Sequence, residues 1–194
     1  MGEKTVLLHT CCAPCSSAII EALMQNGITP VIYYCNPNIY PREEYEIRKN
    51  ECTRYAQSLG LEIVDADYDH ENWLESMKGL ENEPERGGRC LKCFKLRLLR
   101  TAQYASERGI KVITTTLASS RWKSLDQINE AGRWACQQPI LPRLSSAAPH
   151  DEVIWWDQNW RKGGLQERRL QIIKEYDFYN QLYCGCEFSM RRED

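Results

Sequence analysis

The sequence has no long apolar run, no strong net charge and no low-complexity stretch. No segment approaches the roughly 18 apolar residues of a membrane span, so no membrane partner is expected. The first residues, MGEKTVLLHTCC, hold one lysine and one short apolar run, which argues against a secretory signal and predicts a cytoplasmic location. The formal net charge of −2 gives no global attraction to nucleic acid, although a local basic patch could still bind RNA.

The chain also lacks internal repeats and linkers rich in Pro, Gly or Ser, which predicts a single domain over residues 1–194. What it has in excess is cysteine, with ten in 194 residues. Cytoplasmic thiols are kept reduced, so this number indicates metal or redox chemistry rather than structural disulfides. Three cysteines stand alone in apolar or helical segments and are interpreted as packing residues: Cys35, Cys52 and Cys136.

Strand patterns alternate with helix patterns along the chain. Strands are expected at 5–10, 30–36, 61–68, 111–117 and 152–157, and helices at 16–27, 42–60, 71–79, 89–109, 124–137 and 164–183. In the first helix, Ser16 or Ser17 is expected near the N-cap. The alternation predicts an α/β fold with a parallel sheet flanked by helices. HTCCAPC, NPNIYP and TTLASS follow the first, second and fourth strands, so they should lie along one rim, where such sheets bind ligands.

The other seven cysteines form three clusters: Cys11, Cys12 and Cys15; Cys90 and Cys93; and Cys184 and Cys186. Cys90 and Cys93 share one helix face near a helix N-terminus, which favours the thiolate that binds metals. With the first cluster they could hold zinc or an iron–sulfur cluster, or form a thiol redox site. Adjacent Cys11 and Cys12 suit a cluster better than a zinc site. The Cys-Gly-Cys pair suits reversible disulfide chemistry or a supplementary ligand role.

Five motifs together resemble one family over nearly the whole chain. They are CCAPC, NPNIYP, C-x₂-C opening a helix, TTLASS and KEYDFYNQLYCGC, in that order. This combination resembles the QueH type of epoxyqueuosine reductase, which completes queuosine synthesis on tRNA. One departure is SSRWK, where the family usually has S-P-x-K after its TTL strand; Ser120 and Lys123 keep the polar ends of that motif.

The resemblance implies an adenine nucleotide α-hydrolase-like fold, of the HUP type, and a 4Fe–4S cluster. Carried over by motif, the cluster ligands are Cys11, Cys12, Cys90 and Cys93. Cys15 is assigned to an additional iron or other divalent metal beside the cluster. Cys184 and Cys186 correspond to the family's C-terminal pair, with a redox or ligand role, and are grouped with Cys15 and His9 as candidate catalytic residues.

The implied reaction removes the epoxide oxygen of epoxyqueuosine at the tRNA wobble position, which takes two electrons and two protons. An external electron donor is required, because the sequence has no flavin or nucleotide signature. Candidate proton sources are His9, Tyr183 and Lys123, although a histidine beside a core strand is more often structural.

The expected substrate is the tRNA anticodon stem-loop, whose bases can stack on aromatic or arginine side chains. The candidate substrate-binding residues are Lys123, Arg97, Trp160 and Tyr183, with exposed tryptophan expected near residue 160. Basic residues that could form an RNA-binding face, or a solvated helix face, are Arg89, Lys92, Lys95, Arg97, Arg100, Arg161, Lys162, Arg168, Arg169, Arg191 and Arg192.

Two other functions would account for parts of the sequence. A tRNA-thiolating ATP pyrophosphatase shares this type of fold, but it needs a phosphate-binding loop rich in Ser and Gly where this chain has CCAPCSS, without glycine. A non-catalytic zinc-binding RNA module would need only four thiols for a closed structural site. The sequence therefore favours the reductase.

Overall fold

The computed structural model describes residues 4–139 and 152–190, and its centre is a five-stranded parallel sheet. The strands are β1 (Lys4–Thr10), β2 (Ile28–Tyr34), β3 (Ile63–Asp65), β4 (Val112–Thr115) and β5 (Ile154–Trp155). Their order in the sheet is β3-β2-β1-β4-β5, so the chain starts in the middle and winds outward in both directions. The expected parallel α/β fold is confirmed.

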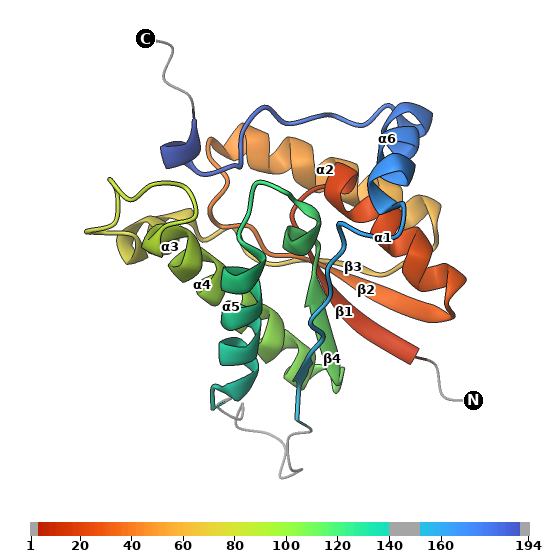
Figure 1. The fold of residues 1–194 in the computed structure, drawn as a ribbon, viewed down its shortest axis with the longest axis horizontal. Coiled ribbons are helices and arrows are strands. Elements are labelled where there is room, and N and C mark those ends of the chain that lie inside the picture. Colours follow the sequence, from red (N-terminus) through yellow and green to blue (C-terminus); the bar gives the residue numbers. More distant parts are fainter. Residues whose placement is uncertain (1–3, 140–151, 191–194) are drawn as a thin grey trace.

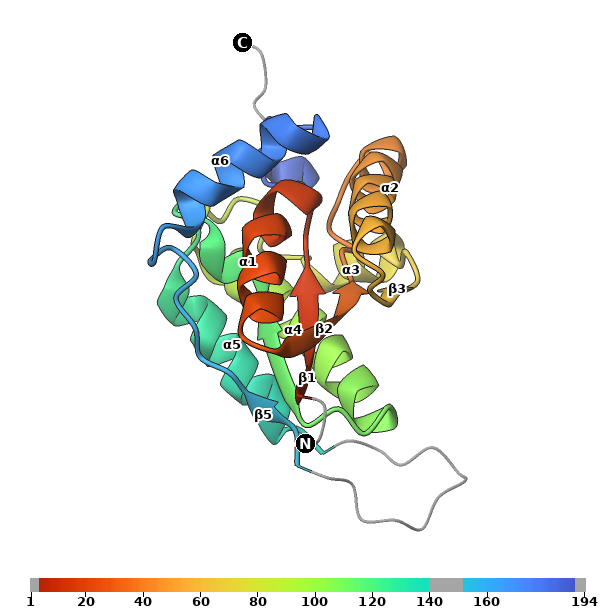
Figure 2. The same ribbon diagram turned by 90° about the vertical axis from the view of Figure 1, so that its right-hand side faces the viewer.

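Helices cover both faces of this sheet (Figures 1 and 2). The helices α1 (Ala13–Gln25), α2 (Arg42–Ser58) and α6 (Leu165–Tyr176) lie on one side. The long helix α4 (Gly88–Glu107) packs against α5 (Leu125–Gln137) on the other side. Shorter helices are α3 (His70–Ser76), η1 (Thr116–Ser119) and η2 (Glu187–Ser189). Within the described residues, no helix has the length and apolarity needed to cross a bilayer.

The core lies between the central strands and these helices. Leu7 and Leu8 of β1, Ile113 of β4 and Leu98 of α4 have at most 1% of their surface exposed. Strand β1 has five consecutive buried residues at its carboxyl end, as expected for a strand covered by helices on both faces. Burial on both faces fixes the end of β1, and therefore the first cysteines, relative to the sheet.

Helix α1 begins three residues earlier than the sequence predicted. Cys12 is its N-cap with extended backbone, and Pro14 lies in the first turn, where its missing N–H is not needed. Ser16 is therefore inside the helix, and its hydroxyl donates to the carbonyls of Cys12 and Ala13. This earlier start places Cys15 in the first helical turn, directly beside the two preceding cysteines.

The last long helix ends earlier than predicted, at Tyr176 instead of residue 183. Asp177 adopts a left-handed backbone conformation with φ of 49°, which ends α6. The following residues, 178–186, leave the helix and run across the carboxyl end of the sheet toward the N-terminus of α4 (Figure 1). Arg191 and Arg192 lie outside the described residues.

Candidate active site

The first three cysteines lie where the winding of the sheet changes direction. The chain moves from β1 to β2 on one side, while β4 pairs with β1 on the other, and the carboxyl ends of two such strands are where parallel sheets usually bind ligands. Cys11 follows β1, and Thr116 follows β4. The backbone N–H of Cys11 donates to the Thr116 hydroxyl oxygen at 3.3 Å, which joins the two ends.

The sulfurs of Cys11, Cys12 and Cys15 lie within 4.8 Å of one another and could hold a metal ion. The Cys11 and Cys12 sulfurs are 3.8 Å apart, and the Gln181 amide donates to the Cys12 sulfur at 3.3 Å. Hydrogen bonds from Cys12 and Cys15, together with the charge of Lys123, hold the pKa of Cys11 well below its usual range. Burial raises the pKa of Cys12. Cys11 is therefore the first thiol of this group to ionise.

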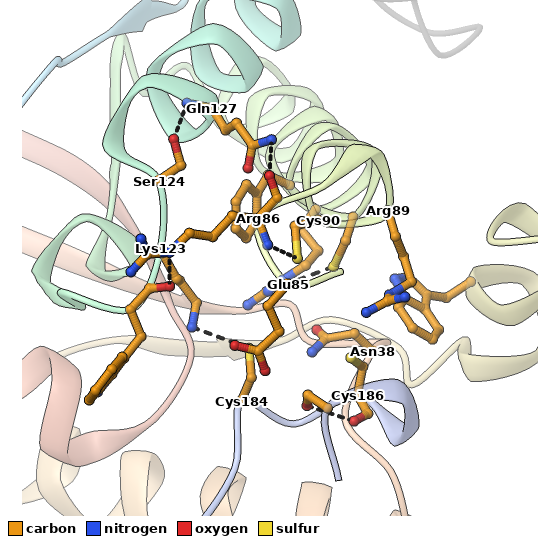
Figure 3. Close-up of a pocket in the computed structure, with 16 residues that line it drawn as sticks. Asn38, Glu85, Arg86, Arg89, Cys90, Lys123, Ser124, Gln127, Cys184 and Cys186 are labelled. Atoms are coloured by element: carbon orange, nitrogen blue, oxygen red, sulfur yellow. Dashed lines mark hydrogen bonds between the residues drawn. The ribbon is translucent and has the colours of Figure 1, made fainter. Parts of the chain in front are cut away.

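The other four clustered cysteines line one pocket beside α4. Cys90 and Cys93 come from the first turns of α4, and Cys184 and Cys186 come from the C-terminal segment (Figure 3). Burial raises the pKa of Cys90, Cys93 and Cys186. The pocket is also lined by four cationic side chains, Arg86, Arg89, Arg97 and Lys123, which can balance thiolate charge. This pocket and the first three cysteines together contain all seven clustered thiols.

Lys123 connects the two groups of thiols. Its ammonium donates to the Cys184 sulfur at 3.2 Å, and its charge also acts on Cys11 and Cys15. Burial alone would lower the pKa of Lys123, but the neighbouring thiolates raise it above its usual range. The ammonium therefore stays protonated between the two groups of sulfurs.

A second connection runs through Arg97 and Asn36. Arg97 is 2% exposed; it donates to the Cys35 carbonyl and the Asn36 side-chain oxygen, and its Nη1 lies 4.0 Å from the Cys93 sulfur. Asn36 in turn donates to the Thr10 carbonyl at 2.9 Å, directly before Cys11. Arg97, a candidate substrate-binding residue, therefore does not belong to an exposed basic face, because its side chain lies inside the protein, at the wall of the pocket.

The Cys-Gly-Cys segment is held by α2. Arg48 is 2% exposed, pairs with Glu44, and donates to the carbonyls of Tyr183 and Cys184. Gly185 has φ of 131°, and a Cβ at this position would lie 3.1 Å from Arg48 and from Ile39. The segment thus approaches α2 so closely that glycine is required between the two cysteines.

His9 is not placed for proton transfer. It is fully buried in β1, with Nδ1 at 2.7 Å from the Thr115 hydroxyl and Nε2 at 3.0 Å from the Cys35 carbonyl. The carbonyl can only accept, so Nε2 carries the proton and Nδ1 accepts from Thr115. Burial lowers the pKa of His9 to about 3. The candidate catalytic role is therefore replaced by a structural one that joins β1, β2 and β4.

The structure also alters the expectations for the two aromatic candidates for substrate binding, Trp160 and Tyr183. Trp160 is only 6% exposed and packs edge-on against Trp156, so the expectation of an exposed tryptophan at this position is wrong. Tyr183 donates to the Tyr40 carbonyl and lies against Arg48, and burial raises the pKa of its hydroxyl to about 12. It fastens the C-terminal segment instead of facing the pocket.

Several of the predicted basic residues have their side chains engaged within the protein. Arg89 is buried and donates to the carbonyls of Leu80, Glu81 and Glu83. Arg168 pairs with Glu21 and Glu175. Cys35 and Cys52 are buried, and Cys136 packs against the core, which confirms their interpretation as packing residues.

Two residues beside the site were missed by the sequence reading. Arg48 lies in a charged helix, and its role depends on a contact with the chain 135 residues later. Trp122 lies in the motif SSRWK and lines the pocket. Its position one residue before Lys123 was a signal that could have identified it.

Known proteins are similar to this chain over nearly its whole length. A family model described as "Epoxyqueuosine reductase QueH" matches residues 6–192. Curated relatives carry the same name. The Histophilus somni protein is 47% identical over 190 residues, covering 98% of this chain and 74% of the relative. The Acinetobacter baylyi protein is 46% identical over 186 residues, covering 96% and 80%. The Thermotoga maritima protein is 33% identical over 194 residues, covering 97% and 93%.

Proposed function

The chain belongs to the QueH family of epoxyqueuosine reductases, and we propose that its thiol-lined rim is where the epoxide oxygen is removed from epoxyqueuosine at the wobble position of tRNA. The product is queuosine. The change from epoxide to alkene consumes two electrons and two protons and releases one water. The site must therefore receive electrons, deliver protons and hold the modified nucleoside.

The donor set fits a 4Fe–4S cluster held by Cys11, Cys12, Cys90 and Cys93. Such clusters bind cysteine thiolates, and all ten cysteines are free. The Nε of Arg89 is buried without a hydrogen-bond partner within the described residues, at the wall of the same pocket, which leaves a donor for a bound group. When bound, the cluster would accept electrons one at a time from an external donor protein or small reductant and pass them to the substrate.

Cys15 is proposed to contribute to a second metal beside the cluster, an iron or another divalent ion. Its sulfur lies within 4.8 Å of those of Cys11 and Cys12, so a metal held by Cys15 would lie directly beside the cluster. Such a metal would supply a Lewis acid that polarises the carbon–oxygen bond of the epoxide.

Cys184 and Cys186 offer a second route for the electron pair. Oxidation of two thiols to one disulfide releases two electrons and two protons, which is the amount that the reduction consumes. Both thiols line the pocket. The external donor would then reduce the disulfide for the next turnover.

Lys123 is the proposed proton donor to the departing oxygen. His9 has both ring nitrogens engaged, and Tyr183 points to the Tyr40 carbonyl, so Lys123 is the remaining candidate of the three. Its ammonium lines the pocket beside Cys184. Opening an epoxide produces an alkoxide, which is basic enough to take a proton from an ammonium group even when the lysine pKa is raised.

The observation that carries this proposal is the family match over residues 6–192 together with seven clustered thiols at one end of the sheet. The test is an anaerobic preparation analysed for iron, sulfide and zinc, with visible spectra before and after dithionite. It is followed by conversion of tRNA carrying epoxyqueuosine, detected by nucleoside mass spectrometry. A protein with iron and sulfide that bleaches on reduction and forms queuosine is expected. A colourless protein with one zinc and no sulfide, even after anaerobic reconstitution, would contradict it in favour of the zinc-binding RNA module.

A further inference from the structure

Trp122 is an exposed aromatic ring at the thiol pocket. Its exposed fraction is 66%, whereas Trp73 and Trp160 are buried, and the other three tryptophans pack against the core. It lines the same pocket as Cys90 and Cys184, and it directly precedes Lys123 in the chain. A large aromatic ring that is exposed to solvent beside the thiol pocket is typical of a binding surface.

Hydrogen bonds between side chains and the loop backbone hold in place the loop that carries this ring. The Arg86 side chain donates to the carbonyls of Arg121 and Trp122, at 3.0 and 2.8 Å. The N–H of Trp122 donates to the Ser120 hydroxyl at 3.3 Å. Because its backbone is fixed before any ligand arrives, a ligand that stacks on Trp122 does not have to order this loop.

Positive charge surrounds the same ring. The Arg121 guanidinium lies over Trp122, with its central carbon 4.9 Å from the ring centroid. Arg161 donates to the Lys123 carbonyl at 2.8 Å, and Arg86 is exposed at the pocket. Glu85 also lines this pocket, so the charge is mixed but mainly positive. An aromatic ring among arginines matches an unstacked nucleobase and its phosphates.

We propose that Trp122 is the stacking platform for a nucleobase of the tRNA anticodon loop and thereby positions the modified nucleoside at the thiol pocket. The inference rests on the proposed function and adds a residue that determines how the substrate is seated. Leu182, which is 91% exposed, does not line the pocket and has no ring that could stack on a base. A protein partner such as the electron donor is the competing occupant of this surface.

The test compares wild type, Trp122→Ala, Trp122→Phe and a control, Met24→Ala. Met24 is exposed near the C-terminal end of α1, away from the cysteines at its N-terminal end. The ligand is a synthetic anticodon stem-loop RNA carrying epoxyqueuosine. We expect Trp122→Ala to weaken binding about 5- to 150-fold, the range for loss of one base–aromatic stack, with KM raised more than kcat is lowered. Trp122→Phe should restore most of the affinity, and Met24→Ala should match wild type.

Fluorescence distinguishes stacking from a structural role. Stacking on a base should quench the Trp122 emission of wild type, and this quenching should be absent from Trp122→Phe although that variant still binds. If Trp122→Ala binds the RNA as wild type does and is slowed only in turnover with a protein donor, the surface belongs to that donor and the inference is wrong. If Trp122→Phe loses affinity equally and wild type shows no quenching, Trp122 only supports the loop. If wild type neither binds nor converts the RNA, the proposed function itself fails.

Discussion

At the scale of single residues, the site depends on which side chains have their polar atoms already occupied. His9 and Tyr183 are polar residues close to the thiols, yet each is fastened to a backbone carbonyl. Lys123 instead contacts a thiol that is itself at the pocket. Chemical type alone therefore does not distinguish the three candidates, whereas their hydrogen-bond partners support Lys123 as the proposed proton donor.

Replacing Lys123 tests its role as a proton donor. Lys123→Met should lower the single-turnover rate by about 10²- to 10⁴-fold, the usual contribution of a positioned acid. Lys123→Arg should remain slow, because an arginine keeps the charge but does not release a proton. Rates are measured by quenched sampling of queuosine formation, at iron content matched to wild type. A fully active Lys123→Arg would show that only the positive charge matters.

His9 should make stability depend on pH. Its pKa of about 3 in the folded protein lies below the value of about 6.5 expected when unfolded, so the unfolded chain binds the proton first. The resulting stabilisation is complete above about pH 6.5 and is lost as the pH falls toward 3, at up to about 1.4 kcal/mol per pH unit. Urea titrations of wild type and His9→Gln at equal metal content, at several pH values, measure this difference. A stability difference between the two proteins that stays constant with pH would contradict the prediction.

At the scale of elements, short segments decide which thiols meet. Pro14 lets α1 start at residue 13, and Asp177 ends α6 at residue 176. The start of α1 at residue 13 places Cys15 beside Cys11. The end of α6 at residue 176 lets the following segment place Cys184 and Cys186 near the N-terminus of α4. Helix boundaries that differ by a few residues from the prediction thus have direct consequences for the site.

Gly185→Ala should disrupt the segment that carries the last two cysteines. The added Cβ would meet Arg48 and Ile39 at 3.1 Å, in a backbone conformation that L side chains rarely adopt. We expect a loss of about 1 to 3 kcal/mol in stability and a strong loss of turnover. Gly79→Ala is the matched control, with φ of 81° and no atom within 4 Å of the new Cβ. Calorimetry and turnover should separate the two variants, and equal activity would show that Gly185 is not needed for the site.

At the scale of the whole molecule, the clustered thiols come from parts of the chain that are distant in sequence. They come from the β1–α1 junction, the start of α4 and the C-terminal segment, which meet at one end of the sheet. A group bound by several of these thiols would connect all three, in addition to its chemical role. Binding to the folded form alone stabilises that form.

Removal of metal should therefore lower thermal stability. We expect the chelated protein to unfold about 10 °C or more below the loaded protein, if the site is occupied well above its dissociation constant. Differential scanning calorimetry of both forms under anaerobic conditions measures the shift. Cys136→Ala, outside both groups of thiols, should show the same shift as wild type, whereas Cys90→Ala should show less. Identical transitions before and after chelation would contradict a metal bridge.

The sequence by itself determined the parallel α/β fold, because strand and helix periodicity repeat clearly along the chain. It also grouped the cysteines into motifs and indicated the family, since both depend on residues close together in sequence. Only the tertiary structure decided that Arg97 and Trp160 are buried, that His9 is fully engaged in hydrogen bonds, and that Arg48 and Trp122 belong to the site. These properties depend on contacts between residues such as Arg48 and Cys184, which are 136 positions apart, and local patterns carry no information about such contacts.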